Sequence, residues 1–259
     1  MKKSTIFLFA ILLPILLHSE NIVSTKSDSQ KHIHSNLLDS IQSKIYNVFV
    51  ADMTRQENVE MKKLNRELLS LSKEKSNAII NYWLGYLQFY QGIFYLQTKQ
   101  NENAKNEINK GIDIINEIKS KTSEDYALLS RLQSISLQFA GMKVMSLSKV
   151  MTENSKTALK LDPENLRANF IYGSNDFYTP EMYGGGKEAE KYLLKAISLP
   201  EQKISNKYLP SWGKDEAYEM LIKFYLKKGN KDKAKHYYEE AIKLYPQNFM
   251  IMQLSGKIQ

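Results

Sequence analysis

Residues 215–248, DEAYEMLIKFYLKKGNKDKAKHYYEEAIKLYPQN, carry the pattern that decides the fold. Apolar residues recur at helical spacing on both sides of Gly229, which predicts two helices joined by a short turn. Ala234 and Ala241 lie seven residues apart on one face of the second helix, and their small side chains allow the first helix to approach closely. Pro246 ends the second helix because it has no backbone N–H donor. The stretch therefore predicts an antiparallel helical hairpin.

The spacing of small residues in this hairpin recurs earlier in the chain. Residues 166–200 hold Ala189 and Ala196 at the same separation of seven, followed by a proline. Gly173 precedes Ala189 by 16 positions, where the last hairpin has 12, and the four extra residues fall within TPEMYGGG. Weaker versions of the pattern lie in residues 76–119 and 123–163.

These recurrences predict the organisation of the chain. One hairpin cannot bury its apolar face alone, so at least three must stack against each other. Short polar breaks between the helical segments favour antiparallel neighbours. We expect an all-α solenoid of about ten antiparallel helices, with an N-terminal capping hairpin over residues 36–74. Repeats are expected over residues 75–259, at about 76–119, 123–163, 166–200 and 215–248.

The spacing in residues 215–248 resembles one tetratricopeptide repeat without a gap. Residues 76–227 resemble, in order, an exported tetratricopeptide family of Bacteroidetes-type bacteria, which has a "YTP…GGG" insert and a Trp-Gly-Lys segment before the last hairpin. This resemblance implies a TPR-like fold but no particular biochemical activity. The GG…A insert is also similar, more loosely, to the periplasmic repeat subunit associated with tripartite (TRAP) substrate transporters.

The N-terminus has the features of an export signal. Two lysines precede an uncharged apolar run over residues 6–17, which is too short to span a bilayer as a helix. We expect a signal peptide over residues 1–19 and a polar, disordered leader over 20–35, with retention of the apolar run as an anchor left open. The protein is then exported, to the periplasm of a Gram-negative bacterium or beyond the cell, and it has no stable membrane span after cleavage. The cleavage site and the oligomeric state stay open.

Charge and cysteine content exclude several classes of function. The formal net charge is +8, but the lysines are spread along helices among glutamates, so we expect no nucleic-acid partner. The chain has no cysteine, which excludes disulfides, thiol nucleophiles and thiolate metal sites. Four histidines, two of them in the leader, give no convincing set of metal ligands. We expect neither a metal nor a cofactor.

The glycine run Gly184–Gly186 followed by Lys187 invites comparison with a phosphate-binding loop. The run follows a helical segment instead of a strand, and Glu188 stands where such a loop needs Ser or Thr for Mg²⁺. A widened turn, in which glycines allow positive φ, accounts for the same residues. No nucleophile elbow or carboxylate pair in a pocket is recognisable either. We therefore predict that the protein is not an enzyme and has no catalytic residues.

The functional prediction rests on the inner helices of the solenoid. Register with the repeat predicts which side chains face the concave groove: Tyr86, Phe89, Ile93, Arg167, Phe170, Ser174, Phe177, Glu219 and Lys223. An apolar groove of this kind suits a peptide helix or an extended segment. Binding of a chaperone tail is not expected, because its carboxylate clamp needs Lys and Asn at positions held here by residues such as Phe89 and Ile93. We predict a non-enzymatic scaffold for a protein or peptide partner; the alternative is a transporter-associated subunit that handles a small molecule or docks a substrate-binding protein.

Overall fold

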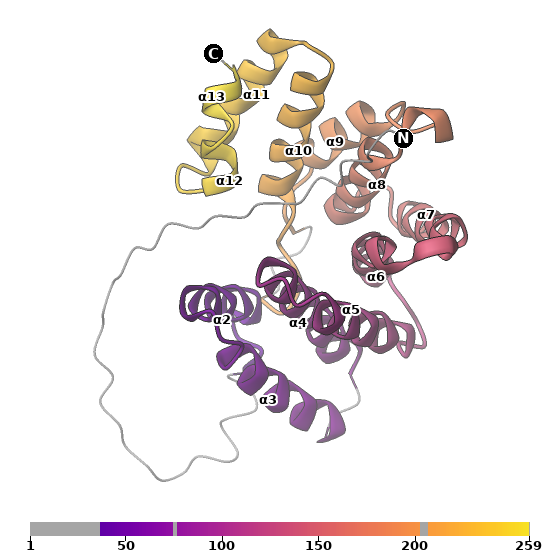
Figure 1. Cartoon of the computed structure of the whole chain (residues 1–259), viewed down its shortest axis with the longest axis vertical. Coiled ribbons are helices and arrows are strands. Elements are labelled where there is room, and N and C mark those ends of the chain that lie inside the picture. The colour runs from indigo at the N-terminus through magenta and orange to yellow at the C-terminus, as the bar shows by residue number, and fades with distance from the viewer. Residues whose placement is uncertain (1–36, 75–76, 203–206, 259) are drawn as a thin grey trace.

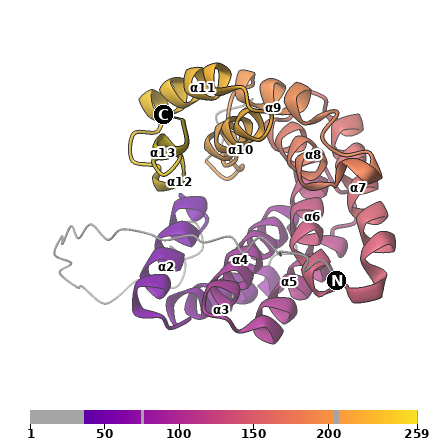
Figure 2. The ribbon, with the colours of Figure 1, turned by 45° about the horizontal axis from the view of Figure 1, so that its top comes forward.

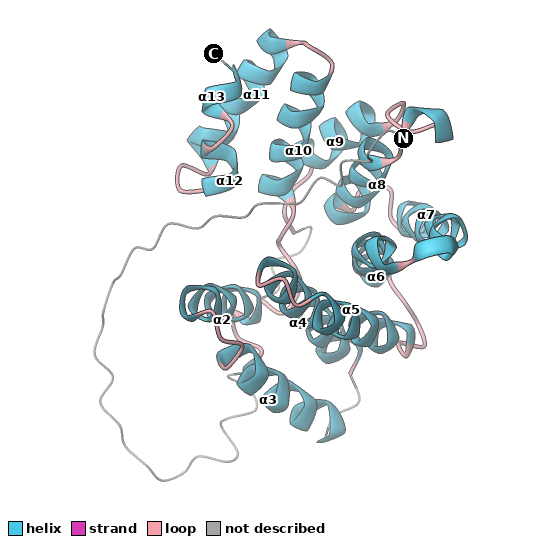
Figure 3. Cartoon of the chain, viewed as in Figure 1, coloured by secondary structure: helices cyan, strands magenta, loops and turns pink. Residues whose placement is uncertain are grey.

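The structure of the protein is a computed structural model that describes residues 37–74, 77–202 and 207–258. The predicted signal peptide and leader lie outside these residues. In the described part every regular element is a helix, and no strand occurs (Figure 3). The main helices are α2 (Ile41–Arg55), α3 (Glu60–Glu74), α4 (Ala78–Gln97), α5 (Asn101–Asn116), α6 (Ser123–Ser136), α7 (Val144–Leu161), α8 (Leu166–Tyr178), α9 (Ala189–Ser198), α10 (Lys214–Lys227) and α11 (Lys231–Leu244).

These ten helices form five consecutive antiparallel hairpins, α2–α3 to α10–α11. Two short helices, α12 (Phe249–Met252) and α13 (Ser255–Ile258), pack on the last hairpin. The hairpins stack side by side and curl into an open ring, in which α4, α6, α8 and α10 lie inside (Figures 1 and 2). The structure thus confirms the predicted all-α solenoid.

Side-chain caps fix where several helices begin. Asn77, Asn165 and Asn230 each accept a hydrogen bond from a backbone N–H in the first turn of α4, α8 and α11. At α6, Thr122 and Asp125 form a reciprocal capping box. Such caps satisfy backbone donors that have no partner inside the helix. The short polar breaks of the sequence therefore set the hairpin boundaries.

Small residues bring the two helices of a hairpin together. The alanines that define the repeat spacing, among them Ala189, Ala196, Ala234 and Ala241, are fully buried. In the α4–α5 hairpin glycine has the same role on the inner helix: a Cβ on Gly92 would lie 2.5 Å from Ile108 Cδ1. A larger side chain there would force Ile108 to move from its place between the two helices.

The segment between α9 and α10 is longer than the other connections and crosses to the first repeats. We call residues 199–213 the connector; of these the structure describes 199–202 and 207–213.

Hydrogen bonds attach the connector to the first repeats. Trp212 Nε1 donates a hydrogen bond to the Tyr82 hydroxyl at 2.8 Å, and Trp83 Nε1 donates to the Tyr208 carbonyl at 2.9 Å. The Ser211 backbone N–H donates to Gln42 Oε1 at 2.8 Å. The connector thereby ties α10 to α2 and α4 across the ring.

The glycine run forms a tight turn between α8 and α9. A short 3₁₀ helix, η3 (Glu181–Tyr183), precedes it, and Gly184 and Gly186 have φ of 88° and 76°. A Cβ on Gly185 would lie 2.0 Å from the Thr179 carbonyl oxygen. The Asp176 carboxylate accepts hydrogen bonds from two backbone N–H groups at the start of α9, both at 2.8 Å. An internal carboxylate therefore already holds the position that a phosphate would take at this helix N-terminus.

Candidate binding groove

The inside of the ring is a wide, open groove with a volume of about 3050 Å³. Its walls come from α2, the inner helices α4, α6, α8 and α10, helix α7, the turn after α8 and the C-terminal segment around α12. Aromatic and methionine side chains line much of it: Tyr46, Phe49, Tyr86, Phe89, Tyr90, Phe139, Met145, Met151, Phe170, Tyr172, Tyr178, Tyr183, Trp212, Met220, Tyr245, Phe249, Met250 and Met252. The groove combines a large apolar lining with an open mouth.

Trp212 of the connector forms the floor of the groove. Its ring stacks on Tyr86 with 5.7 Å between centroids, and it meets Phe170 edge-on at 6.4 Å. The Arg131 guanidinium lies over the Trp212 ring at 4.5 Å and over the Phe89 ring at 4.2 Å. Aromatic and cation–π contacts in these geometries stabilise beyond the area that they bury.

Arg131 is held by a bidentate ion pair with Glu216. The two nitrogen–oxygen distances are 3.1 and 2.7 Å. Burial works against the charged guanidinium, but the facing carboxylate of Glu216, together with Tyr86 and Tyr90, raises the pKa of Arg131 above its usual value. The ion pair thus links α6 to α10 and presents little net charge to the groove.

Arg167 holds the connector in place from α8. It forms a bidentate pair with Glu124, with 2.7 Å between Nη2 and Oε1. Its Nη1 donates to the Trp212 carbonyl at 3.1 Å and to the Glu201 carbonyl at 2.9 Å. Only 4% of the surface of Arg167 is exposed, so its contacts serve to hold the fold together.

Two carboxyl groups of α10 lie at the groove with shifted pKa values. Burial raises the pKa of Asp215 from 3.8 to about 6, and the charge of Glu216 adds to this effect. Asn248, ahead of α12, donates a hydrogen bond to Asp215 at 2.8 Å. Burial also raises the pKa of Glu219, although an ion pair with Lys223 opposes the shift.

The structure brings seven of the nine predicted groove residues to the groove wall: Tyr86, Phe89, Ile93, Phe170, Ser174, Glu219 and Lys223. Arg167 and Phe177 do not line it, because Arg167 turns to the connector and the Phe177 ring lies under Lys227 and beside Tyr178. Among the lining residues, Tyr86, Phe89 and Phe170 are almost fully buried around Trp212 and Arg131. The half-buried members are Ile93, Ser174, Glu219 and Lys223, and these form the accessible part of the predicted set.

Repeat register alone did not identify Trp212, Arg131 or the α2 side chain Tyr46 as groove residues. Trp212 lies outside any repeat, and Arg131 is in the α6–α7 hairpin, whose turn is longer than that of the last repeat. The Trp-Gly-Lys segment before α10 was visible as an unusual feature, but its contacts across the ring have no local sequence signal. In the sequence, only the length of the connector and the presence of Trp212 within it indicate that this segment has a special role.

Neither a metal site nor a membrane span is found where the structure describes the chain. In residues 37–74, 77–202 and 207–258 no three His, Asp or Glu side chains form a group suited to a metal ion. No helix within these ranges is both long and apolar enough to cross a membrane.

Comparison with known proteins identifies the repeat. The tetratricopeptide repeat family matches residues 215–248, the hairpin α10–α11 and the turn that follows it. A comparison with curated proteins gives no significant match. Among solved structures, a thermophilic TPR protein from Thermus thermophilus is 16% identical, with a TM-score of 0.56 over 87% of this chain and 98% of that chain.

A second solved structure, the HusA haemophore from Porphyromonas gingivalis, is 18% identical with a TM-score of 0.53. The similarity covers 78% of this chain and 95% of that one. At these identities the two structures establish a shared fold. The chain therefore has the fold of a tetratricopeptide-repeat solenoid, and its hairpin at residues 215–248 matches the tetratricopeptide repeat family.

Proposed function

We propose that this protein is a non-enzymatic scaffold that binds a protein or peptide partner in its concave groove, after export to the periplasm. The observation that carries the proposal is the groove itself, open and about 3050 Å³ in volume, with an apolar lining on the inner helices. Helical and extended peptides bind in grooves of this type through apolar anchors. Paired charges at the groove, such as Glu219 with Lys223, add polar groups that fix orientation.

Half-buried groove residues offer a test that leaves the floor intact. The double variant Ser174→Arg plus Lys223→Glu adds bulk to α8 and reverses a charge on α10, whereas Trp212 and Arg131 are untouched. We expect affinity capture from a periplasmic extract to recover a partner with the natural sequence and to lose it with this variant. Leu161→Ser is the matched control, because Leu161 is exposed at the far end of α7. Equal recovery by all three proteins would exclude the groove as the binding surface.

Periplasmic location depends on residues outside the described part. Cell fractionation of the full chain with a C-terminal tag checks it, together with N-terminal sequencing of the recovered protein. We expect a periplasmic chain that begins after the apolar run. A chain that stays in the cytoplasm with its first residues intact would contradict export.

The second candidate is a small-molecule carrier, alone or beside a transporter. The α2–α4 side of the groove favours it, because Tyr90 meets Phe49 at 4.9 Å and Tyr46 at 6.3 Å between ring centroids, and Tyr46 is 47% exposed. Such rings suit a flat apolar ligand, and the fold is shared with a haemophore. Titration with haemin, and a thermal-shift screen with organic acids, test the two ligand classes. Absence of a spectral change and of any stabilisation would exclude this candidate.

A further inference from the structure

Three hairpin turns lie along one edge of the solenoid. They join α6 to α7, α8 to α9 and α10 to α11, and consecutive hairpins stack in the same direction. An ion pair of 3.3 Å between Lys228 and Glu181 connects the last two turns. Met145, after the first turn, and Tyr183, in the second, both line the groove. The three turns therefore follow one another along the same edge, which we call the turn edge.

Apolar side chains protrude from the turn edge. Met142 is fully exposed, Met182 is 82% exposed, and Met145 and Tyr183 are each more than half exposed, at 59% and 58%. Gly141, beside Met142, has a positive φ of 52°, and a Cβ at this position would meet no other atom within 4 Å. Side chains this large and apolar are seldom so exposed at several successive turns unless the surface meets another molecule.

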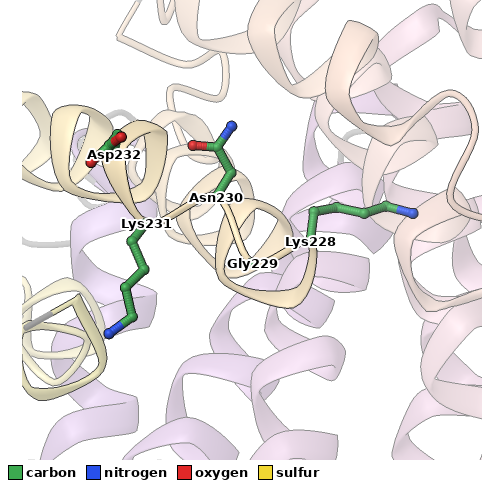
Figure 4. Close-up of a pocket in the computed structure, with 5 residues that line it drawn as sticks. All are labelled: Lys228, Gly229, Asn230, Lys231 and Asp232. Carbon is green, nitrogen blue, oxygen red and sulfur yellow. The ribbon is translucent and has the colours of Figure 1, made fainter.

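Lysines surround these apolar tips. The turn segments 141–149, 179–188 and 227–232 hold six lysines and three acidic residues. Glu181 and Lys228 pair with each other, so these two charges cancel, and the three segments together keep a net charge of +3. Figure 4 shows the last turn, in which the side chains of Lys228 and Lys231 extend outward from the chain at Gly229. The edge is therefore apolar at its tips and basic around them.

We propose that the turn edge docks on the surface of a membrane that contains anionic lipids. The lysines would meet the phosphate headgroups, and Met142, Met182 and Tyr183 would enter the interface between headgroups and acyl chains. The apolar side chains stand on the tips of separate turns, so a protein partner would need a pocket for each at a fixed spacing. A fluid lipid interface accepts protruding side chains at any spacing, and this favours a membrane as the occupant. Docking would hold the groove close to the bilayer. This role is separate from the binding of a partner in the groove.

The absence of cysteine from the sequence allows a site-specific test on the full chain. Single variants Met142→Cys and Met182→Cys carry a polarity-sensitive fluorophore on the turn edge. The matched controls are Leu161→Cys and Leu244→Cys, because these leucines are similarly exposed, at 53% and 54%, but lie at the opposite ends of α7 and α11. Each protein is mixed with vesicles of phosphatidylcholine alone or with added phosphatidylglycerol.

We expect a blue shift from the labels at positions 142 and 182 with the anionic vesicles, and none from the controls. Because screening weakens lysine–phosphate attraction, about 0.5 M salt should reverse most of the shift. Adding Lys143→Gln and Lys187→Gln to the Met142→Cys protein should weaken the apparent vesicle affinity about tenfold or more. The proposal is overturned if both turn-edge labels stay unshifted, if all four labels shift equally, or if vesicles without anionic lipid bind as strongly.

Discussion

At the scale of single residues, Asp215 links the stability of the solenoid to pH. Its folded-state pKa, about 6, lies above the ordinary value of 3.8, because burial and Glu216 disfavour the charged form. The folded state therefore binds more protons than the unfolded state between these two values. This group's contribution to stability is greatest below the lower value and is lost as pH rises through the higher one.

Asp215→Asn removes this titration while keeping the shape of the side chain. The free energy of unfolding of the variant, relative to the natural sequence, should rise by about 2–2.5 kcal/mol between pH of about 4 and neutral pH. Urea titrations at several pH values measure this difference. A difference that does not change with pH would mean that Asp215 titrates normally in the folded protein.

Trp212 is the second residue whose substitution is informative. Trp212→Ala removes the ring stacked on Tyr86 and the partner of the Arg131 guanidinium, so we expect a loss of about 3–5 kcal/mol in the free energy of unfolding. Trp212→Phe keeps an aromatic ring but leaves the Tyr82 hydroxyl without its donor, which should cost about 1–2 kcal/mol. Chemical denaturation ranks the two variants, and equal losses would show that packing of the ring contributes little.

At the scale of elements, the glycine turn between α8 and α9 owes its shape to Gly185 more than to its neighbours. Gly185→Ala places a methyl group against the Thr179 carbonyl, so the backbone must move, and we expect a cost above about 2 kcal/mol. Gly184→Ala meets no atom and strains only a positive φ, at a cost of about 1 kcal/mol. Thermal unfolding compares the variants, and a reversed order would contradict the described turn.

The sequence predicted the hairpins well because their determinants are local. The separation of seven between Ala189 and Ala196 identifies a helix face whatever the rest of the chain does, and it exposed the four-residue expansion that contains η3. The connector was not predicted, because Trp212 and Tyr82 are 130 residues apart and meet only in the finished ring. The repeat register predicted residues of the groove wall but not Trp212 in its floor. That Tyr86 and Phe170 are buried around Trp212 is known only from the structure.

At the scale of the whole molecule, the connector adds contacts between repeats that are not neighbours in the solenoid. Stacked repeats usually interact only with their neighbours, so their ends can unfold separately. Here hydrogen bonds from Trp212 and Ser211 join the start of α10 to α4 and α2. The connector therefore joins the first and last repeats across the open ring, and this closure lets them stabilise each other.

This closure predicts that the described repeats unfold in one cooperative transition. With Trp212→Ala, hydrogen exchange should speed up in α2 and α4 as well as in α10, although α2 is distant in sequence. Exchange followed by mass spectrometry measures each helix separately. Faster exchange confined to α10 and α11 would show that the connector does not couple the two ends.

The central claim, that the concave groove holds a protein or peptide partner, is tested most directly by site-specific photo-cross-linking in living cells. A photoreactive amino acid is placed at Ile93 or Ser174 in the groove, and at Leu161 or Leu244 on exposed helix ends as matched controls. We predict one cross-linked product, of the same mass, from both groove positions and none from the controls. A product from the control positions alone, or equally from all four, would contradict binding in the groove.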